Sequence, residues 1–429
     1  MAIQTQTNLR NQVMYSVYVR NYSEEGTFKA VENDLDRIRE LGVDIIWLMP
    51  IHPVGVKAKK GELGSPYAIK DYRNVNPEFG TMEDFKELVN AIHAKGMKCI
   101  IDVVYNHTSP DSWLVENHPE FFYKKPDGSM GNRVGDWSDI VDLDYNNKEL
   151  WDYQIETLKM WAGIVDGFRC DVAPLIPLQF WLKAREEVAG VNPDCFWLSE
   201  SVEPEFITYL RASKMPALSD SEIFQAFDVC YDYDIHKFLR SYIAGECPLS
   251  TYVEHVNMQE YIYPINYVKL RYLENHDQDR AKSFIESQDA LINWTAFIYF
   301  QKGMTLLYCG QETENDNRPS LFDKDTVKWN TGYDLSVYMK RLYEIKKKKV
   351  FADSIYSLTA FDELDIMVGM HVSDAGKIIG IFNLKDKQGE VTVDAADGTY
   401  VNLINDEKVT VSNGRIYSNG QPVIIEVTE

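Results

Sequence analysis

Asp166-Gly167-Phe168-Arg169-Cys170-Asp171 completes a short apolar run that begins at Ile164 and ends on a carboxylate. The run predicts a buried strand over residues 164–170. Arg169 precedes Asp171 by two residues, so both side chains point to the same face of an extended strand. A guanidinium beside a carboxylate lowers the carboxylate's pKa and favours its ionised form. Asp171 is therefore a candidate nucleophile, with a simple strand-end ion pair as the alternative.

Seven further strand-like runs alternate with helical patterns over the first 350 residues. Residues 28–41 have helical spacing, and Thr81 with Asp84 three residues later predicts another helix start. Eight strands alternating with helices predict an α/β fold, a (β/α)8 TIM barrel. A doubly wound sheet is the alternative, but no GxGxxG motif follows the first strand. The predicted strands are residues 14–19, 43–50, 97–104, 164–170, 195–198, 227–230, 268–273 and 304–308.

Two regions depart from this alternation. Residues 108–147 are rich in Gly, Pro, Asp and aromatic residues and are too long for an ordinary loop, which predicts an excursion subdomain over the barrel mouth. Short alternating segments with turn signals such as Asn413-Gly414 predict an all-β C-terminal domain, a sandwich. We therefore predict a barrel over residues 1–107 and 148–350, the excursion over 108–147, and the C-terminal domain over 351–429.

The composition limits the partners of the chain. Its 44 basic and 66 acidic residues give a net charge of -22, which argues against nucleic acid or an anionic membrane and suits a neutral substrate. No apolar run approaches the roughly 20 residues of a membrane helix. The polar first ten residues lack a signal-peptide core, so we expect a cytoplasmic protein, or a secreted one whose signal peptide was removed. The six cysteines show no CxxC spacing and are expected to be reduced thiols.

Polar residues follow the ends of three other predicted strands. They are residues 102–107, Glu200 and residues 275–277. Since the strand ends of a barrel meet at one mouth, we expect Asp171, Glu200 and Asp277 to converge there. Like charges brought together destabilise a protein, so their convergence indicates a functional site. Glycoside hydrolysis requires two carboxyl groups beside the scissile bond, one as proton donor and the other as nucleophile or base.

At these segments the chain resembles the α-amylase family of glycoside hydrolases. Residues 102–107, residues 167–171, the strand that ends at Glu200, and residues 275–277 match the family's four motifs in order. Two supporting matches are Gly64-Ser65-Pro66-Tyr67-Ala68-Ile69-Lys70-Asp71-Tyr72 with residues 76–81, and residues 141–146. The resemblance spans the barrel, and the β-rich C-terminal region fits the family's C-terminal domain.

The resemblance implies roles for the residues at the strand ends. Asp171 would be the nucleophile that forms a covalent glycosyl intermediate, and Glu200 would be the acid/base. Asp277 would hold sugar hydroxyls and stabilise the transition state. Arg169 is assigned with the substrate-binding residues and would orient Asp171, while Asp102 would support the site from behind.

The resemblance also implies a sugar subsite and a possible metal. His107 and His276 would bind hydroxyls of the sugar at the -1 subsite, and Tyr67 would stack under its ring or be an ordinary loop aromatic. Asn106 and Asp142 match calcium-ligand positions, or else hydrogen-bond the excursion onto the barrel. No cofactor is expected to be required for the chemistry itself.

Two features leave the substrate pattern open. The residues after Asp171 are Val172-Ala173-Pro174-Leu175 and lack the Lys-His pair that follows the nucleophile in many amylases. In the excursion, Trp113 and Trp137 are candidates for stacking on sugar rings or for the core of the subdomain. Phe121 and Phe122 are predicted to belong to that core.

The resemblance leads to ranked hypotheses. The first is a retaining hydrolase of α-1,4-glucosidic bonds in starch, maltodextrin or maltooligosaccharides. The alternative is a 4-α-glucanotransferase or another transglycosylase of the same family, followed by an oligo-α-glucosidase or cyclomaltodextrinase. A non-catalytic binding member ranks last, because Asp171, Glu200 and Asp277 are all present.

Overall fold

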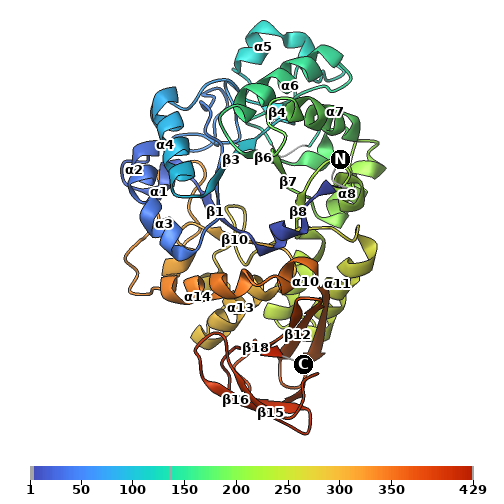
Figure 1. Cartoon of the computed structure of the whole chain (residues 1–429). Helices are drawn as coiled ribbons and strands as arrows, with labels where there is room; N and C mark the ends of the chain where they lie inside the picture. The colour runs from blue at the N-terminus through green and yellow to red at the C-terminus, as the bar shows by residue number, and fades with distance from the viewer. Residues whose placement is uncertain (1–3, 135–136, 428–429) are drawn as a thin grey trace.

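The computed structural model describes residues 4–134 and 137–427. The predicted barrel, excursion and C-terminal domain each include a few residues outside these ranges, namely 1–3, 135–136 and 428–429. Eight parallel strands close a barrel in the order β1-β10-β9-β8-β7-β6-β3-β2, which confirms the predicted TIM barrel (Figure 1). The strands are β1 (Val13–Val17), β2 (Ile45–Leu48), β3 (Lys98–Val103), β6 (Gly167–Cys170), β7 (Phe196–Ser199), β8 (Val229–Tyr231), β9 (Lys269–Arg271) and β10 (Met304–Tyr308).

Helices surround the barrel and pack apolar side chains against it (Figure 1). The predicted start at Thr81 is confirmed: its hydroxyl accepts from the Asp84 N–H, and Asp84 completes a capping box. The helices around the barrel are α1 (Val19–Tyr22), α2 (Phe28–Asn33), α3 (Leu35–Leu41), α4 (Met82–Ala94), α6 (Lys148–Ala162), α7 (Leu178–Ala189), α8 (Pro204–Ala212), α9 (Asp220–Ile223), α10 (Tyr233–Ile243), α11 (Leu249–Ile262), α12 (Ala281–Phe284), α13 (Gln288–Phe300), α14 (Ser336–Lys346) and α15 (Val350–Asp353). The 3-10 turns η2 (Thr7–Asn11), η4 (Ala173–Leu175) and η5 (Gln311–Thr313) complete this part.

The helical pattern over residues 28–41 forms two helices rather than one. The break is at Asp34, whose backbone has φ -105° and ψ 6°. The Asp34 carboxylate accepts hydrogen bonds from Arg37 Nε at 2.8 Å and from the Tyr22 hydroxyl. These contacts with side chains of α1 and α3 accompany the break in the helix. The predicted stop at Gly42 is confirmed, with φ 93°.

The excursion leaves the barrel between β3 and α6 and lies at the top of Figure 1. It holds a two-stranded antiparallel sheet of β4 (His107–Thr108) and β5 (Val141–Asp142), with α5 (Trp113–Asn117) and η3 (Pro119–Phe121). Phe121 and Phe122 are buried in its core, as predicted. Trp113 is 41% exposed and stacks on Tyr153 at 5.8 Å, outside the residues that line the mouth of the barrel.

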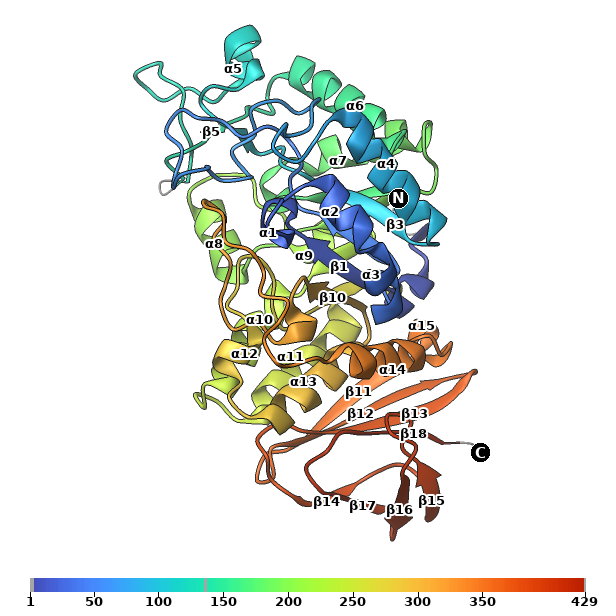
Figure 2. The same cartoon turned by 90° about the vertical axis from the view of Figure 1, so that its left-hand side faces the viewer.

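The C-terminal region is all-β, as predicted, and consists of two antiparallel four-stranded sheets. Both sheets contribute to one apolar core, which includes Ile381 and Ile416. Phe382 also packs edge to face on Phe297 of α13, with ring centroids 5.4 Å apart, so the region is anchored to the barrel (Figure 2). The first sheet comprises β11 (Ile355–Phe361), β12 (Ile366–Ser373), β13 (Gly376–Asn383) and β18 (Val423–Val427). The second comprises β14 (Gly389–Thr392), β17 (Arg415–Ser418), β16 (Lys408–Ser412) and β15 (Gly398–Val401).

The cysteines and the helices bear on two further predictions. All six cysteines are free thiols, as predicted, and all but Cys247 are buried. Within residues 4–134 and 137–427, no helix has the length and apolar character required to span a membrane. The exact division into domains stays a prediction.

Candidate functional site

Asp171 and Glu200 follow the carboxyl ends of two neighbouring strands. β6 and β7 pair in parallel, with Cys170 opposite Ser199. The N–H of Glu200 then donates to the Cys170 carbonyl at 3.0 Å, which extends this register. Arg169 Nη1 lies 2.9 Å from Asp171 Oδ1, and its Nη2 lies 2.8 Å from Glu200 Oε1. One guanidinium therefore bridges both predicted carboxyl groups.

Arg169 is fully buried beneath these carboxyl groups. Its Nη1 also contacts both Asp102 oxygens, at 3.0 and 3.2 Å, and its Nε donates to the Tyr231 hydroxyl at 3.3 Å. It is absent from the residues that line the cavity above it. Arg169, which the resemblance groups with the substrate-binding residues, thus lies in contact with the carboxyl groups and outside the lining of the cavity. Asp102 lies behind the site, as expected.

Asp277 joins the same polar chain through His276 and Tyr67. His276 Nε2 lies 3.0 Å from Asp277 Oδ2 and 2.7 Å from the Tyr67 hydroxyl. The Tyr67 hydroxyl also donates to Asp102 Oδ2 at 3.2 Å, and the Tyr67 ring stacks on the His276 ring at 5.5 Å. Arg169 thus contacts three carboxyl groups directly and is linked to a fourth through Tyr67 and His276. The four groups belong to Asp102, Asp171, Glu200 and Asp277.

A cavity of about 650 Å³, here called the mouth cavity, opens above this chain. The three predicted catalytic residues line it, together with the three predicted sugar-binding residues. They are Asp171, Glu200, Asp277, Tyr67, His107 and His276. Sequence reasoning missed several of its walls, because a single aromatic or basic residue in a loop forms no motif. Trp137 of the excursion, left open above, reaches the cavity and lies 5.7 Å from the His107 ring. Other lining residues not identified from the sequence include Lys60, Asp139, Val202, Phe206, Tyr233 and Arg318.

Burial and charge separate the pKa values of the three carboxyl groups. Burial raises the pKa of Glu200 to about 8, helped by the Asp171 and Asp277 charges and opposed by Arg169. Burial also raises the pKa of Asp171 to about 7 and outweighs the lowering by Arg169 that the sequence led us to expect. Burial acts upward on Asp277 too, but His276 lowers its pKa to about 2. Burial therefore favours the protonated form of Glu200 and of Asp171, whereas Asp277 stays ionised.

The backbone at Val172 fixes the orientation of Glu200. Val172 has φ 35°, a left-handed conformation that a β-branched residue rarely adopts. Its N–H donates to Glu200 Oε2 at 2.8 Å, while Oε1 of the same carboxyl group contacts Arg169. Strained residues of this kind often occur at functional sites, where the surrounding structure enforces them.

Asn106 and Asp142 lie at the base of the excursion, beside His107. Asn106 Nδ2 is 3.2 Å from His107 Nδ1, and burial lowers the pKa of His107, which keeps the ring neutral. Asp142 Oδ2 accepts from the Arg133 N–H at 2.7 Å. Its Oδ1 is buried and has no hydrogen-bond partner among the described residues.

A calcium ion requires six to eight oxygen ligands. Within the part of the chain that the structure describes, no group of three or more His, Cys, Asp or Glu side chains is placed to hold a metal ion. The Arg133 guanidinium lies 3.8 Å from Asp142 Oδ2 and 3.6 Å from Asp144 Oδ1, so positive charge is already present there. These neighbours do not fit a calcium ion, and calcium binding stays an untested prediction.

Models of known families match most of the chain. The model described as "Alpha amylase, catalytic domain" matches residues 9–127 and 134–349. The model described as "Bacterial Alpha amylase C-terminal domain" matches residues 357–425. The two matches correspond to the barrel with its excursion and to the C-terminal sheets.

Individual proteins agree with these models. The crystal structure of an alpha-amylase from Lactobacillus plantarum is 46% identical, with a TM-score of 0.96 over 99% of this chain and 100% of that one. The noncanonic maltogenic alpha-amylase AmyB from Thermotoga neapolitana is 33% identical, with a TM-score of 0.88 over 98% and 100%. Alpha-amylase 3 of Dictyoglomus thermophilum is 24% identical over 75% of this chain and 68% of its own length. Alpha-amylase MalA of Haloarcula japonica is 25% identical over 74% of this chain and 46% of its own length. The site and these matches agree, and the chain belongs to the α-amylase family of glycoside hydrolases.

Proposed function

We propose that the protein is a retaining hydrolase of α-1,4-glucosidic bonds in starch, maltodextrin or maltooligosaccharides. The observation that carries this proposal is the contact of Asp171 and Glu200 with one guanidinium. Adjacent strands run about 4.8 Å apart, and a shared guanidinium favours a short distance between the carboxyl groups. Retaining enzymes separate them by about 5–5.5 Å, and inverting enzymes by about 6.5–9.5 Å.

The proposed reaction uses Asp171 and Glu200 in two steps. Asp171 attacks the anomeric carbon while Glu200 protonates the leaving glycosidic oxygen, and a glycosyl ester forms on Asp171. The ester removes the Asp171 charge, which had helped to raise the pKa of Glu200. The pKa of Glu200 then falls, so that Glu200, which has given its proton to the leaving group, stays ionised and accepts a proton from the water that cleaves the ester. The Val172 N–H and the Arg169 guanidinium hold the two carboxyl oxygens of Glu200 in place.

The remaining residues are assigned to binding the sugar. Asp277, ionised beside His276, accepts hydrogen bonds from sugar hydroxyls and offsets the positive charge of an oxocarbenium-like transition state. Tyr67 offers a flat ring, held in place by its stack on His276. His107, neutral and buried, donates to a hydroxyl, and Trp137 beside it extends the aromatic wall.

Transfer to an acceptor sugar is the second candidate. The α-1,4-glucan:maltose-1-phosphate maltosyltransferase of Myxococcus xanthus is 32% identical over 44% of this chain and 32% of its own length. Transferases and hydrolases share the first step and differ in whether a sugar or water takes the glycosyl group. Chromatography of products from starch, maltoheptaose, pullulan and cyclodextrin, with and without added glucose as acceptor, distinguishes the two. Products longer than maltoheptaose would favour transfer.

Stereochemistry tests the geometry itself. Proton NMR in the first minutes of maltoheptaose cleavage, before mutarotation, should show the α anomer at the new reducing end. An Asp171→Asn protein serves as the control for uncatalysed or contaminating cleavage. A β anomer released first would overturn both the nucleophile assignment and the retaining mechanism.

A further inference from the structure

A second cavity, of about 830 Å³, lies beside α2 and α3. This flank cavity shares no lining residue with the mouth cavity. The loop that joins β10 to α14 borders both: residues 318–322 line the mouth cavity, and residues between 329 and 336 line the flank cavity. The proposed reaction uses none of the residues that line the flank cavity.

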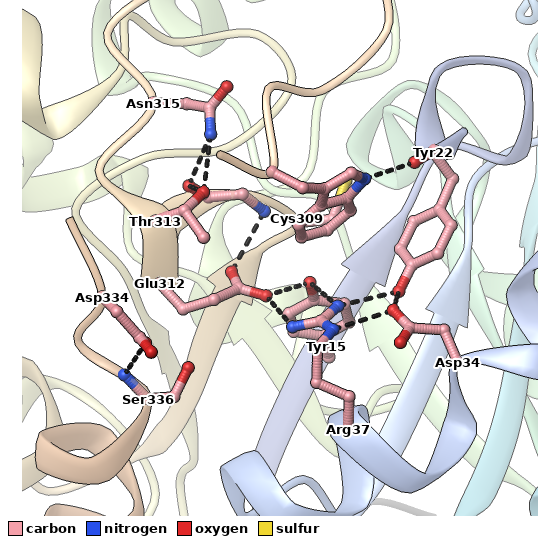
Figure 3. A network of polar contacts seen from close by, with 12 residues as sticks. Tyr15, Tyr22, Asp34, Arg37, Cys309, Glu312, Thr313, Asn315, Asp334 and Ser336 are labelled. Carbon is pink, nitrogen blue, oxygen red and sulfur yellow. Dashed lines mark hydrogen bonds and ion pairs between the residues drawn. The ribbon is translucent and has the colours of Figure 1, made fainter. Parts of the chain in front are cut away.

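The base of the flank cavity is a network of one arginine, two carboxylates and two tyrosine hydroxyls (Figure 3). Arg37 of α3 contacts Glu312 Oε1 at 2.7 Å and Asp34 Oδ2 at 2.8 Å. Glu312 is fully buried and accepts a further hydrogen bond from the Tyr15 hydroxyl at 2.6 Å, while Tyr22 donates to Asp34. The network joins α1, α3, β1 and η5, so the base of the cavity is held rigidly and its charges are already paired.

Aromatic rings form the walls of the flank cavity. The Trp329 ring packs on the Arg37 guanidinium at 4.5 Å and meets the Tyr22 ring edge to face at 5.0 Å. Its Nε1 donates to the Tyr22 carbonyl oxygen at 2.8 Å, which fixes the plane of the indole. Tyr333, on the same loop, is 51% exposed at the rim. Asn33 and Asn330 add exposed amides.

This lining selects a neutral, polar ligand. Lys29 at the rim is paired with Glu32 at 2.6 Å, and Arg37 is already bound to two carboxylates. A charged ligand of either sign meets side chains of its own sign, since Glu25 and Asp334 also line the cavity. Rings beside amides and carboxylates suit a sugar, which has apolar faces and hydroxyl edges. We propose that the flank cavity binds a stretch of α-glucan chain outside the mouth cavity, an inference that rests on the proposed function.

Affinity electrophoresis in gels that contain amylopectin tests this proposal. All proteins carry Asp171→Asn, so that the gel is not hydrolysed. Tyr333→Ala removes the exposed ring, and Ala30→Arg fills the cavity from α2. Tyr261→Ala is the matched control, because Tyr261 is 77% exposed on α11 and lines neither cavity. We expect both flank variants to raise the apparent Kd for amylopectin about tenfold, which corresponds to ~1.4 kcal/mol, and Tyr261→Ala to leave it unchanged.

The same substitutions in the active protein separate this proposal from the proposed function. Turnover of a short chromogenic maltooligosaccharide, too short to reach both cavities, should stay at the wild-type level in Tyr333→Ala and Ala30→Arg. Normal turnover with undiminished retardation in both variants would overturn the flank site alone. Wild-type protein that neither cleaves the short substrate nor is retarded would overturn the proposed function. Equal loss in Tyr261→Ala, or equal retardation in hydroxyethyl cellulose, would overturn α-glucan binding in this cavity.

Discussion

An arginine holds carboxylates together beneath each of the two cavities, and the excess of acid over base differs between them. Arg169, beneath the mouth cavity, faces three carboxyl groups: Asp102, Asp171 and Glu200. Arg37, beneath the flank cavity, faces two, on Asp34 and Glu312. We call these groups the Arg169 cluster and the Arg37 cluster, the second including Tyr15 and Tyr22.

Tyrosine hydroxyls and backbone N–H groups donate to carboxyl groups in both clusters. In the Arg37 cluster, a tyrosine hydroxyl donates to each carboxylate, and the Gly310 N–H donates to Glu312 at 3.0 Å. Carboxyl groups outnumber the arginine by two in the Arg169 cluster and by one in the Arg37 cluster. The Arg169 cluster is buried throughout, and burial raises the pKa of Asp171 and of Glu200, whereas the Arg37 and Asp34 side chains are 34% and 33% exposed. The larger excess of acid and the deeper burial therefore distinguish the proton-exchanging cluster from the structural ion network.

Asp171→Asn should have the largest effect on activity. Removing the nucleophile should lower kcat on maltooligosaccharides at least about 10³-fold, because the covalent route is lost. Asp34→Asn, the corresponding change in the Arg37 cluster, should leave kcat near the wild-type value. Steady-state kinetics on both purified proteins, with circular dichroism to confirm folding, provides the check. Near-normal turnover in Asp171→Asn would contradict the nucleophile assignment.

Arg37→Met should have the largest effect on stability. It leaves the buried Glu312 carboxylate without its cation, and breaking a fully buried ion pair from one side costs about 3–5 kcal/mol. The loss here should be smaller, about 2 kcal/mol, because the Arg37 side chain is 34% exposed and water screens part of its charge. Urea unfolding should show this loss, while kcat of the folded protein stays unchanged. The double variant Arg37→Met/Glu312→Gln should recover part of the loss, since the unpaired charge is gone. A single variant as stable as the wild type would show that the Arg37 cluster does not hold the barrel together.

The pH dependence of kcat/KM should report the Arg169 cluster. Because the pKa of Glu200 is raised to about 8, the acid form is lost as pH rises through that value, and the rate should fall. In Glu200→Gln, measured on a substrate whose leaving group needs no protonation, this alkaline limb should disappear. An unchanged limb in that variant would assign it to another group.

The raised pKa of Glu200 should also make the stability of the protein depend on pH, with a smaller effect. Unfolded Glu titrates near about 4.3, and folded Glu200 near about 8. Between these values the folded state binds more protons, so this group destabilises the protein increasingly as pH rises. The Tm of Glu200→Gln minus that of the wild type should therefore increase from pH 5 to pH 9. A difference that is constant with pH would show that the charged form of Glu200 is not penalised by burial.

The smallest effect is expected at Arg133, another arginine that contacts two carboxylates. If its guanidinium supplies the positive charge beside Asp142 and Asp144, EDTA should leave the Tm unchanged. Arg133→Met should lower the Tm by about 2 °C, roughly the effect of 1 kcal/mol in a large domain. A Tm that falls with EDTA and recovers with calcium would instead support a metal at Asn106 and Asp142.

The barrel and most of its candidate site were predictable because they depend on local spacing. Buried strands appear as apolar runs, and side chains two residues apart share a face, which placed Arg169 and Asp171 together. Strand ends of a barrel meet at one mouth, so Glu200 and Asp277 followed. The break in the helix at Asp34 was not predictable. The hydrogen bonds that its carboxylate accepts from Tyr22 and Arg37 form only in the folded structure.

The sequence by itself therefore determined the order of strands, the residues at their ends and the excess of negative charge. Only the tertiary structure decided that the pKa values of Asp171 and Glu200 are raised, because a pKa depends on burial and on charges from elements far apart in the chain. The same holds for the flank cavity, whose base joins Arg37 to Glu312 across 275 residues. Local periodicity carries no record of such contacts, since they form only when the barrel closes and brings distant loops to the same face.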